Sequence, residues 1–505
     1  MKLSVPREFL PTEKRVAISP ENLPAFIKLG YEVSIQTGAG ELATFTDDNF
    51  EKAGATIISD SSSLLGEADL VLKINPPTIE EIPLFKEGST LISFANPARN
   101  VELLKSLGER KINWLAMDCV PRISRAQSMD ALSSMANVAG YRAVVEASHA
   151  FGRFFTGQIT AAGKVPPAKV LVIGAGVAGL AAIGASRNMG AIVRAFDTRP
   201  AVKDEVKSLG GEFLMLDFEE EGAGSGGYAK VMSKEFIDAE MKLFAEQAEE
   251  VDIIITTAMI PGKKSPVLIT EEMVKSMKQG SVIVDLAAEG GGNCELTQPG
   301  ESIVVHGVTI LGYSDLPSRL ATQSSRLYGN NLVKLVNLLG NTEEFKIDQE
   351  DEIIRGALVL DQGEISWPPP KVEVSVQPQK QSEERVDEPV EEKKSIFSPG
   401  LMLGGLCVLL LAMGWKGENE FLDQLTVFVL ACFVGYMVVW NVTPSLHTPL
   451  MSVTNAISGI IVIGGMLFVS GSNPWIAGVA IFLATINVAG GFLVTHRMLK
   501  MFRKE

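Results

Sequence analysis

The chain of 505 residues carries a formal net charge of −15, and 46% of its residues are hydrophobic. A chain of this length exceeds the size at which a single core usually stays undivided, so two or more domains are expected. The negative charge argues against a nucleic-acid partner, because binding of that kind requires a clustered basic surface.

The cysteines and the N-terminus indicate a largely cytoplasmic protein. Cys119, Cys294, Cys407 and Cys432 form no CxxC pair and no other metal-ligand spacing, so no metal site is expected. The first ten residues, MKLSVPREFL, lack the apolar segment of a signal peptide and are typical of a first β-strand.

Short β-branched segments alternate with helical stretches through the first 367 residues, a pattern typical of α/β folds with parallel sheets. The first set of predicted strands is Lys2–Val5, Glu32–Gln36, Leu70–Ile74, Leu91–Phe94 and Asn113–Met117. The second set is Lys169–Ile173, Ile192–Phe196, Asp252–Thr256, Val282–Asp285 and Val308–Leu311. The two sets predict two Rossmann-like, doubly wound lobes.

Two long helical stretches suggest where the lobes meet. They are predicted over Met129–Phe151, which would cross from the first lobe to the second, and over Arg319–Leu339, which would return. We therefore expect a first α/β lobe at residues 1–130, completed by about 320–367, and a second lobe at residues 131–319.

The second lobe contains a glycine-rich motif directly after its first predicted strand, Lys169–Ile173. Gly174, Gly176 and Gly179 form the pattern GxGxxG at the start of a predicted helix. In dinucleotide-binding folds the first glycine permits a tight turn, the second lets the backbone approach the pyrophosphate, and the third lets helix and strand pack closely. The helix N-terminus attracts the phosphate charge. The motif therefore predicts a dinucleotide site.

An acidic residue follows this motif at the spacing of an NAD site. Asp197, at the end of the next predicted strand, lies 18 residues after Gly179 and is placed to accept hydrogen bonds from the adenosine ribose hydroxyls. Its charge would repel a 2′-phosphate, which favours NAD(H) over NADP(H). Arg199, two residues further on, is also assigned to the cofactor site, and its positive charge weakens this preference without reversing it.

Residues Gly222–Gly227 repeat the GxGxxG spacing in a different context. They follow the acidic run Asp217–Glu221, which would repel a pyrophosphate and is not typical of a strand. A glycine-rich loop with Tyr228 at its tip is the better interpretation. The loop is either an idle surface segment or a lid over the cofactor site.

The sequence changes character after position 367. Pro368–Ser395 is rich in proline and charge and lacks large apolar residues, which predicts a disordered linker. Residues 396–505 hold four apolar segments, long enough to cross the roughly 30 Å hydrocarbon layer of a membrane if the first begins near Ile396. These segments are Pro399–Trp415, Phe421–Trp440, Leu450–Gly471 and Trp475–Thr495. A four-helix transmembrane bundle is therefore expected.

Basic residues predict the orientation of this bundle. They lie before the first segment and after the last, at Lys393, Lys394, Arg497, Lys500, Arg503 and Lys504. By the positive-inside rule, both termini and the soluble part are expected in the cytoplasm, as in a multi-pass protein of the inner membrane. No Asp, Glu, Lys or Arg lies in the middle of a segment, so we do not expect this chain alone to move protons.

The part before the linker offers little acid–base machinery. Its two histidines, His149 and His306, neighbour neither a nucleophile nor a paired acid. Oxidation of an alcohol or an amino acid requires a group that moves a proton along with the hydride. Hydride transfer directly between two nicotinamides requires only positioning and the exclusion of water.

Several segments together resemble one family, the proton-translocating nicotinamide nucleotide transhydrogenases. Pro121–Ser134, with the sequence PRISRAQSMDALSS, resembles the signature loop of their NAD-binding domain. The segments Gly226–Lys230 and Ala288–Glu295 are similar to two further shared segments. The order of soluble part, linker and four apolar segments resembles the alpha subunit of the bacterial two-subunit enzymes.

This resemblance implies roles for particular residues. Arg122, Gln127 and Asp130 would hold the nicotinamide and pyrophosphate of NAD(H) against the second nucleotide, and Ser133 would contact the nicotinamide. Tyr228 would lie at the site in a mobile loop. We also assign to the cofactor site the neighbouring residues Ser128, Met129, Val177, Thr198 and Gly227.

The resemblance also implies partners. NADP(H) and the proton path would belong to a separate beta subunit, since the chain offers one credible dinucleotide motif and no charged residue in the middle of its apolar segments. The soluble part is expected to form a homodimer within an assembly of two alpha and two beta subunits, anchored in a lipid membrane.

Two alternatives remain. Alanine dehydrogenase has the same two-lobed fold, and Arg15 and Lys73 match residues that would hold its substrate. Asn96, however, replaces the catalytic histidine of that family, and Glu289 replaces an aspartate. The other alternative is a membrane protein that senses NAD without catalysis.

Overall fold

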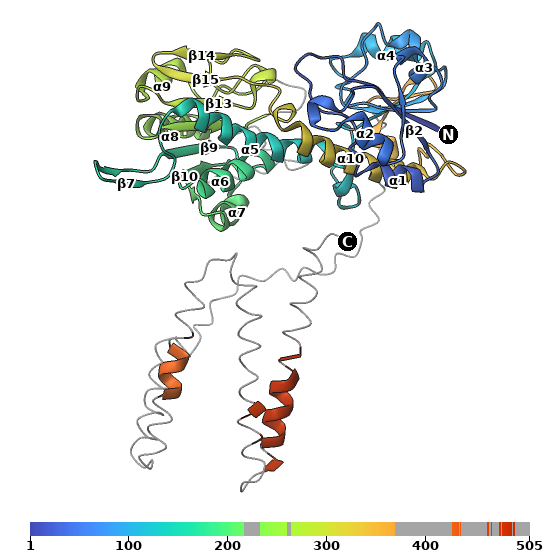
Figure 1. The fold of residues 1–505 in the computed structure, drawn as a ribbon. Helices are drawn as coiled ribbons and strands as arrows, with labels where there is room; N and C mark the ends of the chain where they lie inside the picture. Colours follow the sequence, from blue (N-terminus) through green and yellow to red (C-terminus); the bar gives the residue numbers. More distant parts are fainter. Residues whose placement is uncertain are drawn as a thin grey trace. The chain divides into compact units, whose positions relative to one another are not determined.

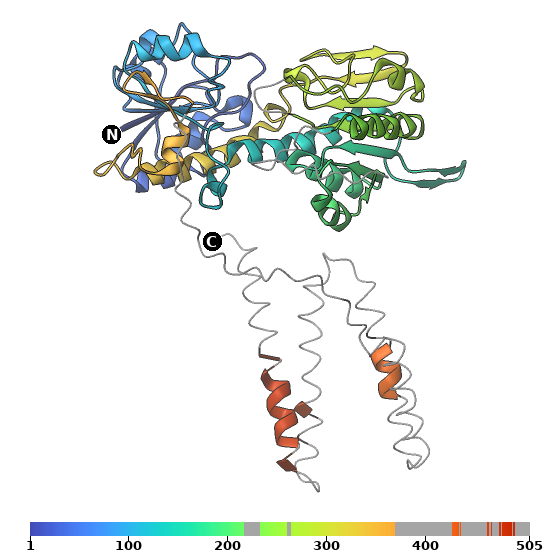
Figure 2. The same ribbon diagram turned by 180° about the vertical axis from the view of Figure 1, so that it is seen from behind.

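The computed structural model describes residues 1–216, 233–259 and 264–368, together with individual helical residues between 427 and 489. The chain forms two compact units, Met1–Glu373 and Val374–Glu505. The first unit contains two α/β lobes, which the ribbon drawings show with a pair of long helices between them (Figures 1 and 2).

The first lobe is built on an eight-stranded sheet with the strand order β17-β16-β6-β5-β4-β1-β2-β3. Its strands are β1 (Lys2–Val5), β2 (Glu32–Gln36), β3 (Thr56–Ile58), β4 (Leu70–Leu72), β5 (Thr90–Ser93), β6 (Asn113–Ala116), β16 (Leu358–Asp361) and β17 (Glu364–Ile365). The first six strands run parallel, and β16 adds to β6 in the antiparallel direction. The order of the parallel strands is that of a doubly wound fold.

Five short helices accompany this sheet in the described part of the chain: α1 (Leu23–Lys28), α2 (Asp47–Lys52), α3 (Ser61–Gly66), α4 (Val101–Gly108) and α11 (Glu352–Ala357). Because both faces of the sheet are covered, its inner strands are almost wholly apolar, as in the fully buried β4 sequence LVL.

The second lobe repeats the same architecture with a seven-stranded sheet in the order β11-β10-β9-β12-β13-β15-β14. Its strands are β9 (Lys169–Ile173), β10 (Ile192–Phe196), β11 (Glu212–Phe213), β12 (Ile253–Thr256), β13 (Val282–Asp285), β14 (Ser302–Val305) and β15 (Val308–Leu311). All pairs are parallel except β14 with β15. The helices α6 (Val177–Asn188), α7 (Lys203–Ser208), α8 (Lys234–Glu250) and α9 (Glu271–Ser276) accompany it.

A two-stranded hairpin, β7 (Gln158–Thr160) and β8 (Gly163–Val165), extends from the second lobe (Figure 1). It was not anticipated from the sequence.

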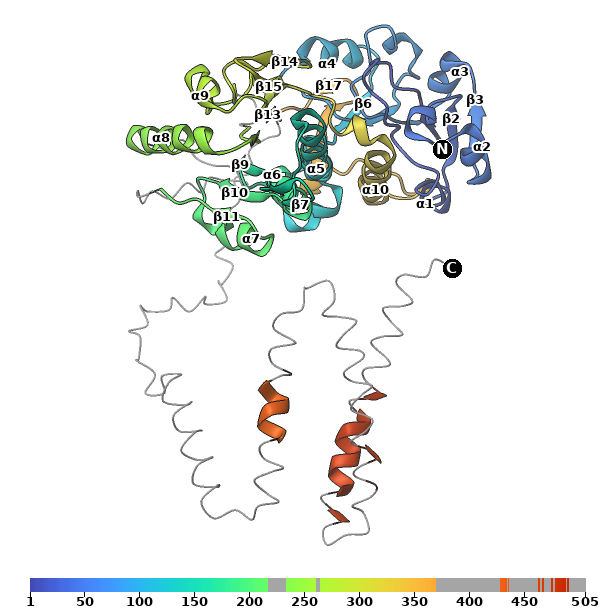
Figure 3. The same ribbon diagram turned by 60° about the vertical axis from the view of Figure 1, so that its left-hand side comes forward.

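Two long helices, α5 (Ala131–Phe151) and α10 (Ala321–Leu339), connect the lobes and pack against each other (Figure 3). Each begins two residues later than the sequence predicted. A 3₁₀ segment precedes each helix, Ser124–Met129 before α5 and Ser318–Leu320 before α10. Asp130 lies between the first of these segments and α5, and its side chain caps the start of α5.

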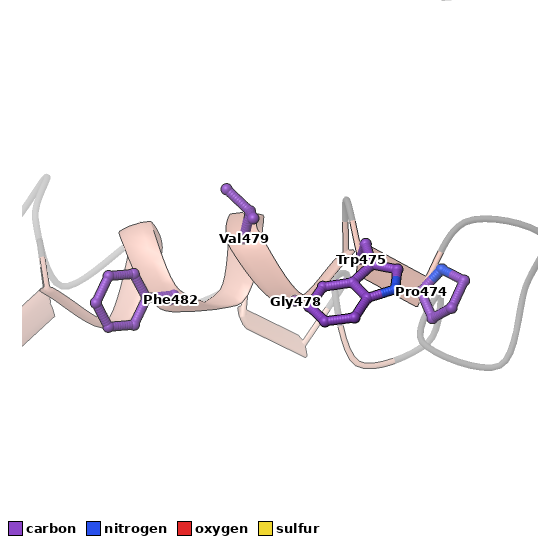
Figure 4. Close-up of a pocket in the computed structure, with 5 residues that line it drawn as sticks. All are labelled: Pro474, Trp475, Gly478, Val479 and Phe482. Carbon is purple, nitrogen blue, oxygen red and sulfur yellow. The ribbon is translucent and has the colours of Figure 1, made fainter.

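The second unit is described only at separate helical positions, among them 427–433 and 477–486. Within these described positions, no helix is both long and apolar enough to cross a membrane. The predicted linker after Pro368 and most of the four predicted spans lie outside the described residues. Figure 4 shows a shallow apolar surface formed by Pro474, Trp475, Gly478, Val479 and Phe482.

Candidate functional site

The glycine turn between β9 and α6 has the geometry of a dinucleotide-binding turn. Gly174 has a φ of +97°, and a Cβ atom there would lie 2.4 Å from the hydroxyl oxygen of Thr257. A Cβ atom on Gly179 would lie 1.8 Å from the carbonyl oxygen of Gly174. The first position therefore requires glycine for its backbone, and the third requires it for the close approach of helix to strand.

The middle glycine faces open space. A Cβ atom on Gly176 would meet no atom within 4 Å. Gly176 is also the N-cap of α6, and no side chain caps this helix. The first backbone N–H groups of α6 are thus available to an anionic group, and a pyrophosphate fits the open space in front of them.

Asp197 follows the last residue of β10, as predicted, and its carboxylate is fully engaged. It accepts hydrogen bonds from Ala175 N at 2.7 Å, from Arg199 N at 2.9 Å, and from the Arg199 guanidinium at 2.8 Å through both Nε and Nη2. These donors fill the four or so lone-pair positions of a carboxylate. The hydrogen bonds to Asp197 also raise the pKa of Arg199. Ribose hydroxyls can reach Asp197 only if the Arg199 guanidinium moves aside.

A threonine connects the glycine turn to the neighbouring strand through hydrogen bonds. Thr257, just after β12, donates its hydroxyl to the carbonyl oxygens of Ile173 at 3.2 Å and Gly174 at 3.1 Å. The sequence analysis missed this residue. Its position at the carboxyl end of a central parallel strand was the available signal, because ligands bind at that edge in doubly wound sheets.

A second missed residue, Asp285, organises the loop after β13. This fully buried carboxylate accepts hydrogen bonds from the backbone N–H groups of Ala287, Asn293 and Cys294 at 2.9, 2.7 and 3.0 Å. It also accepts from the hydroxyls of Thr256 and Thr297. Residues 288–295, which resemble a segment shared by the family, therefore lie in a loop that is fixed by hydrogen bonds to the carboxylate of Asp285.

Asn293 ties this loop to the one after β12. Its Nδ2 donates to the carbonyl oxygens of Ala258 and Pro266, and its Oδ1 accepts from the Ala258 N–H. The carboxyl ends of β12 and β13 thus form one hydrogen-bonded platform beside the glycine turn.

The loop that resembles the transhydrogenase signature lies at the start of α5. Arg122, Gln127 and Ser128 are exposed, whereas Met129 is buried. Asp130 caps α5: its carboxylate accepts from the Ser133 N–H at 2.8 Å and from the Ser133 hydroxyl at 2.6 Å.

Helix α5 brings this loop toward the glycine turn. A Cβ atom on Gly140 of α5 would lie 2.0 Å from the carbonyl oxygen of Ala178, which immediately precedes Gly179 in α6. Ser133 lies seven residues earlier on α5, or about 10 Å along the helix axis. Val177 begins α6 and Thr198 follows Asp197, so both lie beside the turn. Gly227 and Tyr228 lie outside the described residues.

The two histidines of the described lobes lie away from the carboxyl edge of the second sheet, where the glycine turn is. His306 is in the turn before β15, at the amino end of that strand, and its Nε2 is 3.0 Å from Glu271. His149 is exposed near the C-terminal end of α5. The glycine turn therefore has no imidazole beside it among the described residues.

The residues matched to the alanine dehydrogenase substrate site are engaged internally. Arg15 forms two hydrogen bonds to Glu13, and Lys73, almost fully buried, pairs with Glu81. The backbone N–H of Asn96 donates to Asp118 at 2.8 Å, and its amide side chain is no acid or base at neutral pH. This part of the first lobe lacks the imidazole that reductive amination would use.

Comparisons with known proteins agree with the two-lobed fold. The family "Alanine dehydrogenase/PNT, N-terminal domain" matches residues 4–139, and "Alanine dehydrogenase/PNT, C-terminal domain" matches residues 143–368. The family "4TM region of pyridine nucleotide transhydrogenase, mitoch" matches residues 424–504.

Individual relatives are more specific. The chain is 56% identical to an NAD(P) transhydrogenase subunit alpha of Haemophilus influenzae and 50% identical to one of Cereibacter sphaeroides, with 100% of each chain covered in both cases. The crystal structure of a transhydrogenase from Sinorhizobium meliloti matches with a TM-score of 0.64 at 37% identity, covering 73% of this chain and 99% of that one. An alanine dehydrogenase of Staphylococcus aureus is 30% identical over 69% of this chain and 91% of its own.

Fold and site together define a two-lobed dinucleotide-binding protein of the alanine dehydrogenase and pyridine nucleotide transhydrogenase class. Within this class, alanine dehydrogenase is the more distant relative. The chain belongs to the family of NAD(P) transhydrogenase alpha subunits.

Proposed function

We propose that this chain binds NAD(H) in its second lobe and exchanges hydride with NADP(H) on a partner beta subunit, as part of a proton-translocating transhydrogenase. The observation that carries the proposal is the glycine turn at the carboxyl edge of the second sheet. Its open space at Gly176 faces an uncapped helix N-terminus, and Asp197 lies beside it. A dinucleotide requires these features together.

The choice of NAD(H) over NADP(H) rests on Asp197. Its carboxylate would accept hydrogen bonds from ribose hydroxyls and repel a 2′-phosphate. Arg199 is held by that carboxylate, so the guanidinium charge that could favour a phosphate is already paired.

The residues at the start of α5 position the reacting ring. A bound nicotinamide supplies the hydride chemistry itself. Arg122 and Gln127 are exposed and thus accessible to the ring, and Ser133 lies in the first turn of α5, the helix that contacts α6 at Gly140. Asp130 orients Ser133 through two hydrogen bonds. Because hydride passes directly between two rings, this site needs no acid or base, in line with the positions of His149 and His306.

We divide the chain accordingly. The first lobe comprises residues 1–130, completed by about 320–367, and the NAD(H)-binding lobe comprises residues 131–319. Residues 368–395 act as a linker and residues 396–505 as a membrane domain with four spans. The match of 424–504 to a transhydrogenase membrane region supports this division, as does the exposed apolar row Trp475, Val479 and Phe482 (Figure 4).

The assembly follows from the same reasoning. Both termini and the soluble part lie in the cytoplasm, since basic residues flank the apolar segments. A beta subunit supplies the NADP(H) site and the proton path, because this chain has one credible dinucleotide motif and no charged residue in the middle of its apolar segments. Two alpha and two beta subunits associate, with the soluble parts paired.

The decisive experiment measures hydride transfer with purified components. The full-length chain, in detergent, is titrated with NADH and with NADPH, and is then mixed with NADH, an NADP⁺ analogue and the partner's soluble NADP-binding domain. We expect binding of NADH in preference to NADPH, no transfer by this chain alone, and transfer once the partner domain is added.

Other outcomes select other functions. Reduction of pyruvate in the presence of ammonia by the isolated chain would favour the alanine dehydrogenase alternative. Binding of NADH without any transfer in the complete mixture would favour an NAD sensor.

A further inference from the structure

Glu240 is a buried carboxyl group that the proposed function does not use. It lies on α8 and is 8% exposed. Among the described residues, no hydrogen bond or salt bridge involves its carboxyl group. Burial without a partner disfavours the ionised form of a carboxyl group and so favours protonation.

The fold places Glu240 at the level of the cofactor site. Helix α8 precedes β12, which runs parallel to β9, so α8 runs back from the carboxyl edge of the sheet toward the amino edge. Phe244 of α8 packs edge-to-face on Phe196, with ring centroids 5.2 Å apart. Glu240 lies one turn earlier on the same side of α8, about 6 Å nearer the carboxyl edge. Phe196 is the last residue of β10, and Asp197 is the next residue.

Few charged groups among the described residues lie near Glu240. Burial raises the pKa of Glu240 to about 7, and the negative charge of Asp197 contributes to the rise. The charge of Asp197 is itself paired with Arg199. Helix α9, which packs against α8, carries Glu271 and Lys275, and these pair with each other. The residues three and four positions away from Glu240 on α8 are apolar: Phe236, Ile237, Leu243 and Phe244.

We propose that Glu240 is a titrating group of the NAD(H) site, which takes up a proton when the cofactor binds beside Asp197. The inference rests on the proposed function, since it takes NAD(H) as the ligand beside Asp197. A bound dinucleotide brings a negatively charged pyrophosphate to the same edge and shields the carboxyl group from water. Both effects favour the protonated form, so cofactor binding near neutral pH takes up a proton from the solvent.

The direction of the pH dependence follows from linkage. Below the pKa of the free chain Glu240 is already protonated and binding is unaffected by pH. As the pH rises above it, each binding event must protonate Glu240, so affinity for NADH falls. If the cofactor raises the pKa of Glu240 by about one unit, affinity should fall about tenfold between pH 6 and pH 9.

The test compares three forms of the full-length chain in detergent: unmodified, Glu240→Gln and Glu246→Gln. Glu246 lies on the exposed side of the same helix, so the second substitution removes the same charge away from the site. The dissociation constant for NADH is measured from pH 6 to pH 9. We expect the tenfold fall in affinity for the unmodified chain and for Glu246→Gln, and a flat profile for Glu240→Gln.

A calorimetric measurement makes the result independent of the variant. Heats of NADH binding to the unmodified chain at pH 8, in two buffers of different ionisation enthalpy, report proton uptake directly. Zero uptake, or an equal pH slope in the unmodified chain and Glu240→Gln, would overturn the inference while leaving NADH binding intact. Failure of the unmodified chain to bind NADH at any pH would overturn the proposed function instead.

Discussion

Asp197 links the local turn to cofactor choice. One of its oxygens holds the Ala175 N–H in the glycine turn, and both hold the guanidinium of Arg199. The orientation of this carboxylate is therefore set by backbone N–H groups as well as by Arg199. Asp197, which is expected to bind the ribose, is therefore also hydrogen-bonded to the turn that is expected to bind the pyrophosphate.

Asp197→Asn should relax the discrimination between the two cofactors. The amide keeps one oxygen for the Ala175 N–H but removes the negative charge, and with it a charge-assisted hydrogen bond to the ribose. NADH should bind about tenfold more weakly, since such bonds contribute about 1.5–3 kcal/mol. NADPH should bind no worse. Titration of both nucleotides checks this, with Asp204→Asn on the exposed side of α7 as control. Unchanged discrimination would remove Asp197 from the ribose site.

Helix α6 shows how one element can impose opposite demands on two glycines. Gly179 lies under the carbonyl oxygen of Gly174 and leaves no room for a Cβ atom. Gly184 lies one and a half turns further along, where a Cβ atom would make an ordinary contact of 3.7 Å with Leu209. The first glycine sets the distance between helix and strand, and the second only loosens the helix.

Alanine at these two positions should therefore act in opposite directions. Gly184→Ala should stabilise the lobe by about 0.5–1 kcal/mol, because alanine restricts the unfolded chain and favours helix. Gly179→Ala should destabilise it by about 3 kcal/mol and abolish NADH binding, because helix and turn must separate. Thermal unfolding and NADH titration of both variants provide the check. A well-folded Gly179→Ala variant with normal affinity would contradict the geometry of the turn.

At the scale of the whole unit Met1–Glu373, the two lobes are joined by the packing of α5 against α10. Glu146 of α5 accepts from Arg142 at 2.8 Å and from Arg319, just before α10, at 3.1 Å. Arg319 also lies over the ring of Tyr313, 3.6 Å from its centroid. This group of charges joins the two crossing segments and so contributes to the alignment of the lobes.

Glu146→Gln should weaken this junction in a pH-dependent way. Burial opposes ionisation of Glu146, but hydrogen bonds from the two arginines outweigh it and hold its pKa below the ordinary value of 4.5. A lowered pKa stabilises the fold above pH 4.5, and this contribution disappears as the pH falls through the folded-state pKa. The variant should be less stable by about 1–3 kcal/mol at pH 7. The difference should shrink below about pH 4, and denaturant unfolding at both pH values tests it.

Gln127→Asn tests the apposition of two nucleotides across subunits. Gln127 is exposed in the loop before α5, so a shorter amide should leave the fold and NADH affinity nearly unchanged. It should still displace the nicotinamide by about a bond length, and hydride transfer falls steeply with misplacement. Single-turnover transfer in the complex with the partner domain should slow at least tenfold, while the dissociation constant for NADH changes little. Parallel losses in binding and transfer would assign Gln127 a role in affinity instead.

Much of the fold was predictable because its central strands are local patterns. Buried parallel strands are short apolar runs between turn residues, and the predicted runs in both lobes correspond to β1, β2, β4, β5 and β6 and to β9, β10, β12, β13 and β15. The strands that were missed, such as β3, β11 and β17, are short edge strands. In these strands polar and apolar residues alternate less clearly. Each forms because it pairs with a neighbouring strand, and periodicity along the chain does not reveal that pairing.

The sequence by itself determined the doubly wound lobes, the glycine turn and the position of Asp197, since each depends on residues close together in the chain. Only the tertiary structure decided which distant groups meet at that turn. Thr257 reaches the turn from another strand, Asp285 gathers donors from its own loop, and α8 carries Glu240 to the level of Asp197. Their charge states and partners depend on burial and on neighbours far away in sequence, and these exist only once the sheets have formed.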